Sequence, residues 1–458
     1  MRILFVRPNI GRLAEGAYID EGRMEPLELA VLASLTPRQH DCLICDDRVE
    51  KIPYDEPADL VAITVETYTA RRSYEIADEF RARGVKVIMG GFHASLLPGE
   101  CAEHADSVFI GDAESLWSEV LDDAHRGCLK SVYQGTVGNP QAGGVLPRRE
   151  LYSHHDYLPL SLIQFGRGCK YACSFCAIHA FFRRHHCVRP SRDVLREIEQ
   201  AENRYVFFVD DNFLSDRDAA KSFLRELVGK RVRWVSQGSI DMTLDTELMD
   251  LMEASGCIGH VIGFESLSPE NLKGMKKAPN LIGRGWDRYQ KACEILRNHH
   301  LQTWAAFTLG HDHDTAESIT EVADFAIENK FCVAAFNILM PYPGTAFYER
   351  LKAQGRLLYD GQWWLHPDYR FNHAAFRPAN MTADELTEAC WKCKQRWSRP
   401  ATIFRRFWDV KTHLRSPLRM AVFFDFNRLV AKEVRRKQGM YFGLKHASLG
   451  AAQTTVAE

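Results

Sequence analysis

Two successive series of short apolar runs, each followed by a segment of helical periodicity, constrain the fold of this chain more than any other feature. In the first series, over about 125 residues, we expect helices near 26–36, 70–83, 99–104 and 114–125. Alternation of strand and helix at this spacing predicts a parallel, doubly wound sheet. Its expected strands are Arg2–Arg7, Cys42–Cys45, Leu60–Val65, Val85–Met89 and Ser107–Ile110.

A second series follows an irregular, glycine-rich stretch (126–160), which we interpret as a linker. Six β/α units predict a partial (β/α)6 TIM-like barrel, whose site should lie at the carboxyl ends of the strands. We therefore divide the chain into residues 1–130, a linker at 131–160, a barrel at 161–354 and a mostly helical, basic and aromatic-rich extension at 355–458. The expected barrel strands are Leu162–Phe165, Tyr205–Val209, Val232–Ser236, His260–Phe264, Thr303–Leu309 and Val333–Met340.

Composition and charge narrow the class of protein. The chain is 46% hydrophobic and 26% charged with a net charge of −2, as in a soluble globular protein with no general affinity for nucleic acid. The first apolar stretch is too short for a signal peptide, so we expect a cytoplasmic protein. Residues 399–458 nevertheless carry twelve lysines and arginines against four acidic residues. This basic, aromatic segment favours a large amphiphilic or anionic small-molecule substrate, peripheral contact with an anionic membrane, or simply a solvated helical cap.

Three of the thirteen cysteines form a distinctive group. Cys169, Cys173 and Cys176 have C-x3-C-x2-C spacing and directly follow the first expected barrel strand. Three thiolates can hold a [4Fe–4S] cluster and leave one iron free to chelate a small molecule through amino and carboxylate groups. The alternative is a zinc site, which needs a fourth ligand such as His179 or a residue of 185–187.

The triplet, with Phe175 before the last cysteine and Gly166–Gly168 before the first, resembles the signature of the radical S-adenosylmethionine superfamily. Residues 208–213, 263–266 and 337–345 resemble strand-end motifs of the same superfamily. An N-terminal α/β domain joined to such a barrel is similar to the cobalamin-binding subgroup, of which the run 90–94 (GGFHA) is typical. The resemblance covers about residues 1–350 and implies a flavodoxin-like N-terminal domain.

The resemblance also implies roles for cofactors and residues. Cys169, Cys173 and Cys176 hold the cluster, and the open iron binds S-adenosylmethionine. An external electron donor of the flavodoxin or ferredoxin type reduces the cluster, which cleaves S-adenosylmethionine to a 5′-deoxyadenosyl radical. The expected nucleoside contacts at strand ends are Phe175, Asp210, Asp211, Gln237, Glu265 and Ser266, although a salt bridge or helix cap is the alternative for each acidic residue.

For cobalamin, the resemblance points to the carboxyl ends of the first sheet, where glycines indicate a close backbone approach to a bulky group. The loop after the first strand, Arg7–Arg12, lacks the histidine that ligates cobalt in some cobalamin enzymes. His93 is a candidate cobalt ligand, a corrin contact or a structural residue, and a domain that binds nothing is the alternative. The expected corrin contacts are Pro8, Asn9, Thr67, Gly90, Gly91, His93, Gly111 and Glu114.

The function implied by the resemblance is a cobalamin-dependent methyltransferase that acts on an unactivated carbon, or on phosphorus, of a biosynthetic intermediate. One S-adenosylmethionine would remethylate the cobalamin, and a second would yield the substrate radical. One alternative is an oxidative cyclase of the Mg-protoporphyrin monomethyl ester type, without methyl transfer. Another is a cobalamin or iron–sulfur sensor or binding module.

Overall fold

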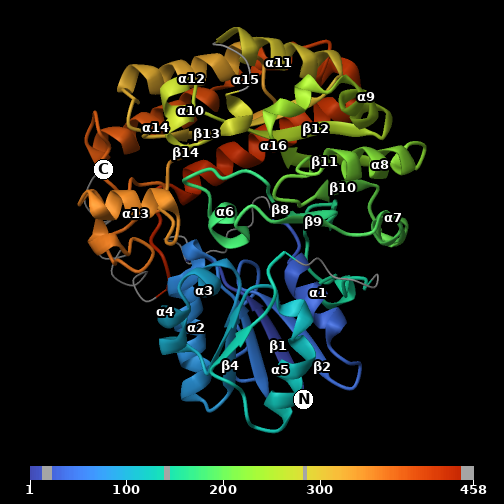
Figure 1. Cartoon of the computed structure of the whole chain (residues 1–458), viewed down its shortest axis with the longest axis vertical. Helices are drawn as coiled ribbons and strands as arrows, with labels where there is room; N and C mark the ends of the chain where they lie inside the picture. The colour runs from blue at the N-terminus through green and yellow to red at the C-terminus, as the bar shows by residue number, and fades with distance from the viewer. Residues whose placement is uncertain (13–22, 139–144, 282–285, 445–458) are drawn as a thin grey trace.

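Two parallel β-sheets, one in each half of the chain, organise the protein (Figure 1). The computed structural model describes residues 1–12, 23–138, 145–281 and 286–444. For residues 286–288 it describes the backbone only. The N-terminal domain lies at the bottom of Figure 1, and the second sheet with its helices lies above it. The expected α/β fold, with a doubly wound sheet and a partial barrel, is confirmed.

The N-terminal sheet has six parallel strands in the order β2-β1-β3-β4-β5-β6, which contains the flavodoxin order. Its strands are mostly buried on both sides, as the continuous apolar runs predict. The last strand lies in the stretch expected to be a linker and pairs with β5, so the sheet extends past residue 130. The strands are β1 (Arg2–Arg7), β2 (Asp41–Asp46), β3 (Leu60–Thr64), β4 (Lys86–Gly90), β5 (Ser107–Ile110) and β6 (Val132–Gln134).

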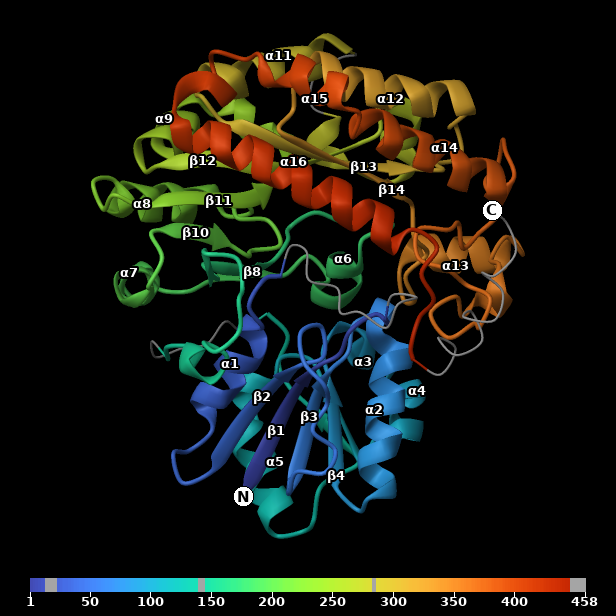
Figure 2. The ribbon, with the colours of Figure 1, turned by 180° about the vertical axis from the view of Figure 1, so that it is seen from behind.

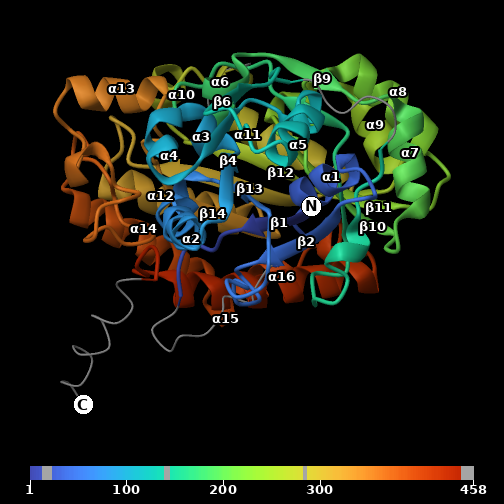
Figure 3. The ribbon, with the colours of Figure 1, turned by 90° about the horizontal axis from the view of Figure 1, so that it is seen from below.

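Helices cover both faces of this sheet (Figure 3). One apolar cluster joins one face to α2, α3 and α4, and a second cluster joins the other face to α1 and α5. Helix α2 is amphipathic and buries Ile76, Ala77 and Phe80 against the sheet. The helices are α1 (Leu27–Leu35), α2 (Ala70–Ala82), α3 (Phe92–Leu96), α4 (Pro98–His104) and α5 (Trp117–His125).

The second sheet is also parallel, in the order β14-β13-β12-β11-β10-β7. Its strands are β7 (Ser161–Ile163), β10 (Tyr205–Phe208), β11 (Arg233–Gly238), β12 (Cys257–Glu265), β13 (Gln302–Leu309) and β14 (Val333–Ile338). The order begins and ends on β7 and β14, as expected for an open, partial barrel. A short antiparallel pair, β8 (Gly166–Gly168) and β9 (His186–Val188), follows β7 and was not expected from the sequence.

Local side-chain caps explain where several barrel helices begin. Asp216 and Asp245 accept hydrogen bonds from the first turns of α8 and α9, and Thr315 forms a capping box with Ser318 at α12. The helices are α6 (Ala177–Phe182), α7 (Ser191–Gln200), α8 (Arg217–Leu227), α9 (Thr246–Ala254), α10 (Pro269–Gly274), α11 (Trp286–Asn298), α12 (Ala316–Glu328) and α13 (Ala346–Ala353).

The C-terminal extension is helical, with α14 (Ala383–Trp397), α15 (Pro400–Phe407) and α16 (Pro417–Lys437). In Figure 2, α16 runs across the outside of the barrel. Arg406 of α15 is fully buried and donates hydrogen bonds to the carbonyls of Phe331 and Cys332, just before β14. Helices α15 and α16 therefore pack at the amino ends of the barrel strands. Among the described residues, no helix is both long and apolar enough to cross a membrane.

Candidate functional site

The cysteine triplet lies on the loop between β8 and α6. Cys173 is buried, whereas Cys169 and Cys176 are half-buried. Burial raises the pKa of Cys173 to about 12, with Lys277 acting in the opposite direction and the other two thiols adding to the rise. Burial also raises the pKa of Cys176, although the backbone N–H groups of His179 and Ile178 favour its thiolate. Two thiols that burial makes costly to ionise, Cys173 and Cys176, suit a cationic metal centre, which favours the deprotonated form.

The spacing of these thiols favours a polynuclear centre. In the described part of the chain, the ligand atoms of Glu50, His154 and His155 all lie within 4.8 Å of one another. The three cysteine sulfurs do not all meet this limit. A single zinc ion with Zn–S bonds of about 2.3 Å would hold its sulfurs only about 3.8 Å apart. The wider triplet therefore fits a [4Fe–4S] cluster better than a zinc ion.

Three consecutive residues after β10 hold in place the loop that carries the three cysteines, which we call the cluster loop. The buried Asp210 accepts hydrogen bonds from the backbone N–H groups of Phe165 (3.0 Å) and Gly166, and burial raises its pKa to about 8. Asp211 accepts a hydrogen bond from Gly168 N at 2.7 Å. Asn212 Nδ2 donates to the sulfur of Cys169 at 3.5 Å. The two carboxylates expected to contact the nucleoside thus bind the backbone in front of the first cysteine.

An ion pair lies beside the same loop. Glu265, at the end of β12, adopts a left-handed backbone conformation (φ 64°), and its Oε1 lies 2.7 Å from Lys277 Nζ. Burial alone would lower the pKa of Lys277, but Glu265, Cys173 and Cys176 together raise it. The lysine is thus a permanent cation facing the thiols. Lys277 was missed in the sequence because its neighbour Lys276 is exposed, and two adjacent lysines give no sign of burial.

The remaining expected nucleoside contacts lie around this ion pair. Ser266 is buried, and its Oγ accepts hydrogen bonds from Ser268 N and Asn271 Nδ2. Gln237 is half-buried near the end of β11, and Phe175 packs against the main apolar core. Among these expected contacts, Glu265 is linked to the cysteines through a charged neighbour, Lys277.

A cavity of about 520 Å³ lies between the carboxyl ends of the N-terminal strands and the two elements that flank the cysteine loop, β8 and α6. Apolar rings form much of its wall, with charged groups at intervals, as in many cofactor sites. Both domains contribute to it. Its lining includes Arg7, Glu66, Gly90, Gly91, Phe92, Phe109, Gly111, Asp112 and Glu114 from the first domain, and Gln164, Arg167, Phe181, Phe182 and Asp211 from the second.

Arg167 joins the two domains across this cavity. Its guanidinium lies 2.7 Å from Glu114 Oε1 and 3.2 Å from Asp112 Oδ1, both just after β5. The residue belongs to β8, two positions before Cys169. Burial raises the pKa of Asp112, and Arg167 opposes that rise. The loop that carries the cysteines is therefore tied directly to the end of the N-terminal sheet.

Glu66, just after β3, is an acidic residue of the cavity wall whose pKa is strongly raised. Its side chain is accessible where it lines the cavity, and the walls of this partly open cavity surround it with protein atoms. This burial raises the pKa of Glu66 to about 7, with Arg7 lowering it and Glu28 and Asp211 raising it. Near neutral pH the carboxyl therefore exists in both protonation states. Sequence patterns gave no signal for this role.

The expected corrin contacts divide into two groups. Gly90, Gly91, Gly111 and Glu114 line the cavity, whereas Pro8, Asn9, Thr67 and His93 are not among its lining residues. His93 is fully buried, and its two ring nitrogens lie 3.2 Å from Thr67 Oγ1 and 2.9 Å from Glu100 Oε1. Its place in the fold is thus within a polar network of the first domain.

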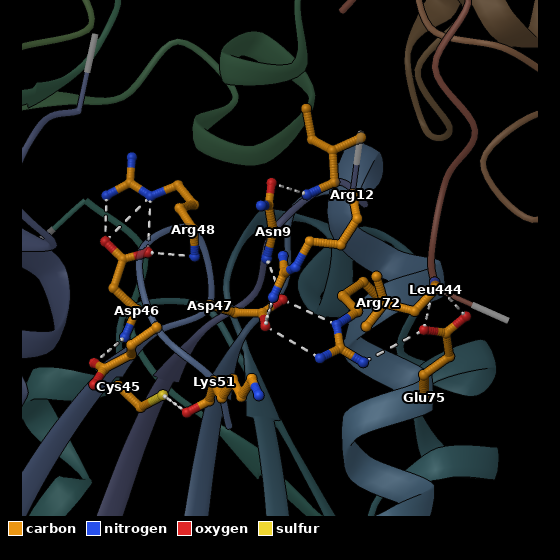
Figure 4. Close-up of polar contacts among 12 residues, drawn as sticks. Asn9, Arg12, Cys45, Asp46, Asp47, Arg48, Lys51, Arg72, Glu75 and Leu444 are labelled. Carbon is orange, nitrogen blue, oxygen red and sulfur yellow. Dashed lines mark hydrogen bonds and ion pairs between the residues drawn. The ribbon is translucent and has the colours of Figure 1, made fainter. Parts of the chain in front are cut away.

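Asn9 belongs to a buried cluster of charges at the ends of β1 and β2 (Figure 4). Asp47 is fully buried, accepts a hydrogen bond from Asn9 N, and forms ion pairs with Arg12 and Arg72. Figure 4 also shows Leu444 N donating to Glu75 in α2. This part of the sheet edge is occupied by the protein itself, so the cavity extends over the ends of β3, β4 and β5.

Contacts within the protein explain why two positions at this edge are glycine. Gly91 (φ 102°) and Gly111 (φ 87°) are in left-handed conformations, and a Cβ on them would lie 2.9 Å from Val65 O and 2.8 Å from Gly135 O. The protein's own backbone is therefore enough to explain these two glycines, and the close approach of a bulky ligand to them stays a prediction. At Gly90 a Cβ would make an ordinary van der Waals contact with Phe109 Cβ at 3.7 Å, so no internal contact requires glycine there.

Comparisons with known proteins agree with this arrangement. The profile of the radical SAM superfamily matches residues 163–326. The chain is 30% identical over 401 residues to bacteriochlorophyllide d C-12(1)-methyltransferase of Chlorobaculum tepidum, covering 85% of this chain and 86% of the relative. It is 24% identical over 465 residues to anaerobic magnesium-protoporphyrin IX monomethyl ester cyclase of Rubrivivax gelatinosus, covering 91% and 79%.

The fold has a counterpart among solved structures. The radical S-adenosylmethionine methyltransferase TsrM from Kitasatospora setae, solved with cobalamin and a [4Fe–4S] cluster bound, superimposes with a TM-score of 0.67 at 16% identity. The match covers 95% of this chain and 99% of TsrM. The likeness therefore includes both domains and the C-terminal extension.

Proposed function

The chain belongs to the radical SAM superfamily, and from that premise we propose that it is a cobalamin-dependent methyltransferase acting on an unactivated carbon of a biosynthetic intermediate. The observation that carries the proposal is the position of the cysteine loop: Arg167 before it and Phe181 and Phe182 after it line a cavity at the carboxyl ends of a flavodoxin-like sheet. The residues fit the two groups, because one loop supplies three thiols for the cluster and the cavity beside that loop offers partly apolar space for a corrin.

When bound, the [4Fe–4S] cluster supplies the electron that cleaves S-adenosylmethionine, and cobalamin supplies the methyl group. Cys169, Cys173 and Cys176 hold the cluster, and Lys277 offsets the negative charge of their thiolates. Glu265 keeps Lys277 in place. The apolar rings Phe92, Phe181 and Phe182 exclude water from the space beside the loop, which protects radical chemistry from quenching.

We assign the acceptor to the large, partly apolar molecules of the tetrapyrrole type. Two relatives that each match more than four fifths of this chain are named for bacteriochlorophyllide and magnesium-protoporphyrin chemistry. The extension beyond residue 355 adds Trp363, Trp364 and Tyr369 to the buried aromatic residues near the end of β14. These buried rings make the segment of the extension beside β14 strongly apolar.

The reductant in this proposal is an acidic one-electron carrier of the flavodoxin or ferredoxin type. Arg183 and Arg184 are exposed directly after α6, and Arg184 Nε donates to the carbonyl of Lys170, the neighbour of Cys169. Lys276 is exposed on the other side, beside Met275, whose carbonyl accepts a hydrogen bond from Ser174 N. A cationic surface around the cysteines favours an acidic donor. We place the protein in the cytoplasm, since its thirteen cysteines are all free thiols.

The test needs no substrate. The protein is purified without oxygen, reconstituted with iron, sulfide and hydroxocobalamin, and mixed with S-adenosylmethionine and a strong reductant. Mass spectrometry should then detect 5′-deoxyadenosine, S-adenosylhomocysteine and methylated cobalamin. The Cys173→Ala variant should form no 5′-deoxyadenosine, whereas Cys128→Ala, an exposed cysteine far from the loop in sequence, should match the wild type.

The same assay separates the alternatives. A cyclase, as in the relative of Rubrivivax gelatinosus, would yield 5′-deoxyadenosine without S-adenosylhomocysteine or methylated cobalamin. A sensor or binding module would retain both cofactors and cleave nothing. Either result would remove methyl transfer from the proposal.

A further inference from the structure

Helices α15 and α16 present an unusual concentration of exposed aromatic side chains. Eight large apolar side chains are exposed in the described part of the chain, and four of them lie between residues 404 and 424. They are Phe404 (57% exposed), Trp408 (58%), Val410 (77%) and Phe424 (40%). We call this surface the α15–α16 face. Soluble proteins normally scatter exposed apolar residues singly, so such a group marks an interaction site.

The aromatic residues of this face adjoin one another. The ring centroids of Phe404 and Trp408 are 6.1 Å apart, and Phe407 packs against Phe424 at 4.6 Å. The two helices are held rigidly underneath. The Arg406 guanidinium stacks 3.4 Å from the centroid of Trp397 and donates to Asn427 Oδ1 of α16 at 2.8 Å. The rings therefore form one preformed surface.

Cations surround these rings. The exposed Arg405 and Lys411 lie beside Phe404 and Val410 in the sequence, and Arg415 follows in the turn before α16. Arg428 is exposed one helical turn beyond Phe424, on the same stripe of α16. Asp425 is an exposed acidic neighbour, whereas Asp409 is buried in an ion pair with Arg297. The balance of charge at the face is clearly positive.

We propose that the α15–α16 face docks the protein on an anionic lipid bilayer surface. Tryptophan and phenylalanine side chains favour the boundary between headgroups and acyl chains, and arginine and lysine pair with anionic headgroups. A second copy of the chain fits this face less well, because two such faces would bring their cations together. The face lies at the amino ends of the barrel strands, away from the cysteine loop, so the proposal does not depend on the proposed function.

Vesicle sedimentation with the reconstituted full chain tests the proposal. The protein should pellet with phosphatidylcholine vesicles that contain phosphatidylglycerol, remain in solution with phosphatidylcholine alone, and be released by high salt. The triple variant Phe404→Ser, Trp408→Ser and Phe424→Ser should bind about tenfold more weakly or worse. The pair Arg405→Glu and Arg428→Glu should weaken binding by at least about fivefold for each charge.

Matched controls come from exposed apolar residues elsewhere, Tyr205→Ser and Leu244→Ser, which should bind vesicles as the wild type does. Trp408 also serves as a local probe: vesicles should shift the fluorescence of the wild type to the blue, and Trp408→Phe should lose that shift while still binding. All face variants should form 5′-deoxyadenosine normally in vesicle-free buffer, which separates this test from that of the function.

Two results would overturn the proposal. One is vesicle binding that neither the triple variant nor the charge variants reduce. The other is a dimer in solution that the triple variant dissociates, because the face would then belong to a second copy of the chain.

Discussion

Lys277 Nζ lies 2.7 Å from Glu265 Oε1, and this ion pair is the only charged contact that the described residues place between the end of β12 and the segment facing the cysteine thiols. The lysine lowers the pKa of both Cys173 and Cys176, and these thiols in turn raise the pKa of the lysine. The charge of a bound cluster would thus be balanced in part by a single side chain from outside the cysteine loop.

Replacing Lys277 by methionine should therefore impair cluster assembly. The variant loses the cation that favours the thiolates and leaves Glu265 as an additional buried negative charge beside them. We expect lower iron and sulfide content after reconstitution and an altered electron paramagnetic resonance spectrum of the reduced cluster. Lys276→Met is the matched control, because it removes the exposed neighbouring charge. Equal iron content in the two variants would contradict the role of Lys277.

Retention of corrin should depend on pH through Glu66. Its pKa is raised to about 7, so the folded protein holds this proton more tightly than the unfolded chain does. This contribution to stability is complete below the ordinary pKa of a glutamate and is lost as the pH rises through about 7. A ligand that fills the cavity removes water from the carboxyl and further favours its neutral form.

We therefore expect more hydroxocobalamin to stay bound after gel filtration at pH 6 than at pH 8. Glu66→Gln should retain similar amounts at both pH values, because its amide does not titrate. Glu56→Gln, at an exposed position before β3, should keep the pH dependence of the wild type. A wild type without any such dependence would argue that the carboxyl does not face the corrin.

Loss of Arg167 should weaken the contact between the domains. Arg167→Gln removes the cation that pairs with both Asp112 and Glu114 at a largely buried site, and we expect the free energy of unfolding to fall by about 2 to 4 kcal/mol. Thermal unfolding measures the effect, and the double variant Arg167→Gln, Glu114→Gln should recover part of it. Arg126→Gln, which removes the exposed partner of Asp123, should lower the unfolding temperature much less.

Charge reversal near the cysteines should slow reduction by a protein donor. With reduced flavodoxin as the reductant, Arg184→Glu should form 5′-deoxyadenosine about fivefold to tenfold more slowly at low salt. With titanium(III) citrate in excess, the variant and the wild type should reach the same final yield. Arg231→Glu is a close control, since Arg231 is also exposed with a positive φ but lies before β11. Identical flavodoxin rates for all three proteins would count against an acidic donor at this surface.

Much of the fold was predictable because buried parallel strands appear as uninterrupted apolar runs. Each expected strand of both sheets appears in the structure within a few residues of its expected bounds. The strands that were not expected are short. The strand β6 has three residues in a polar stretch, and β8 consists of Gly166, Arg167 and Gly168, which carry no apolar pattern.

Site residues were predictable only where they lie close together in the sequence with a recognisable spacing. The three cysteines lie within eight residues, so their pattern is visible in the sequence. Arg167 and Glu114 are 53 residues apart, and Lys277 follows Glu265 by 12, so neither pair forms a motif. Asp210 and Asp211 were recognised as important, but their hydrogen bonds to backbone N–H groups depend on the path of the loop and left no trace in the sequence.

The hydrogen bond from Leu444 N to Glu75 joins residues that are 369 positions apart, and it lies beside the Asp47 cluster of the first domain. At roughly 5 to 20 residues per second, a ribosome needs about 20 to 70 s to make the intervening chain. The first domain therefore emerges long before its final contact exists. A nascent chain that stops before residue 444 would leave this edge of the first sheet without that contact, so the first domain is completed by a segment made much later than the domain itself.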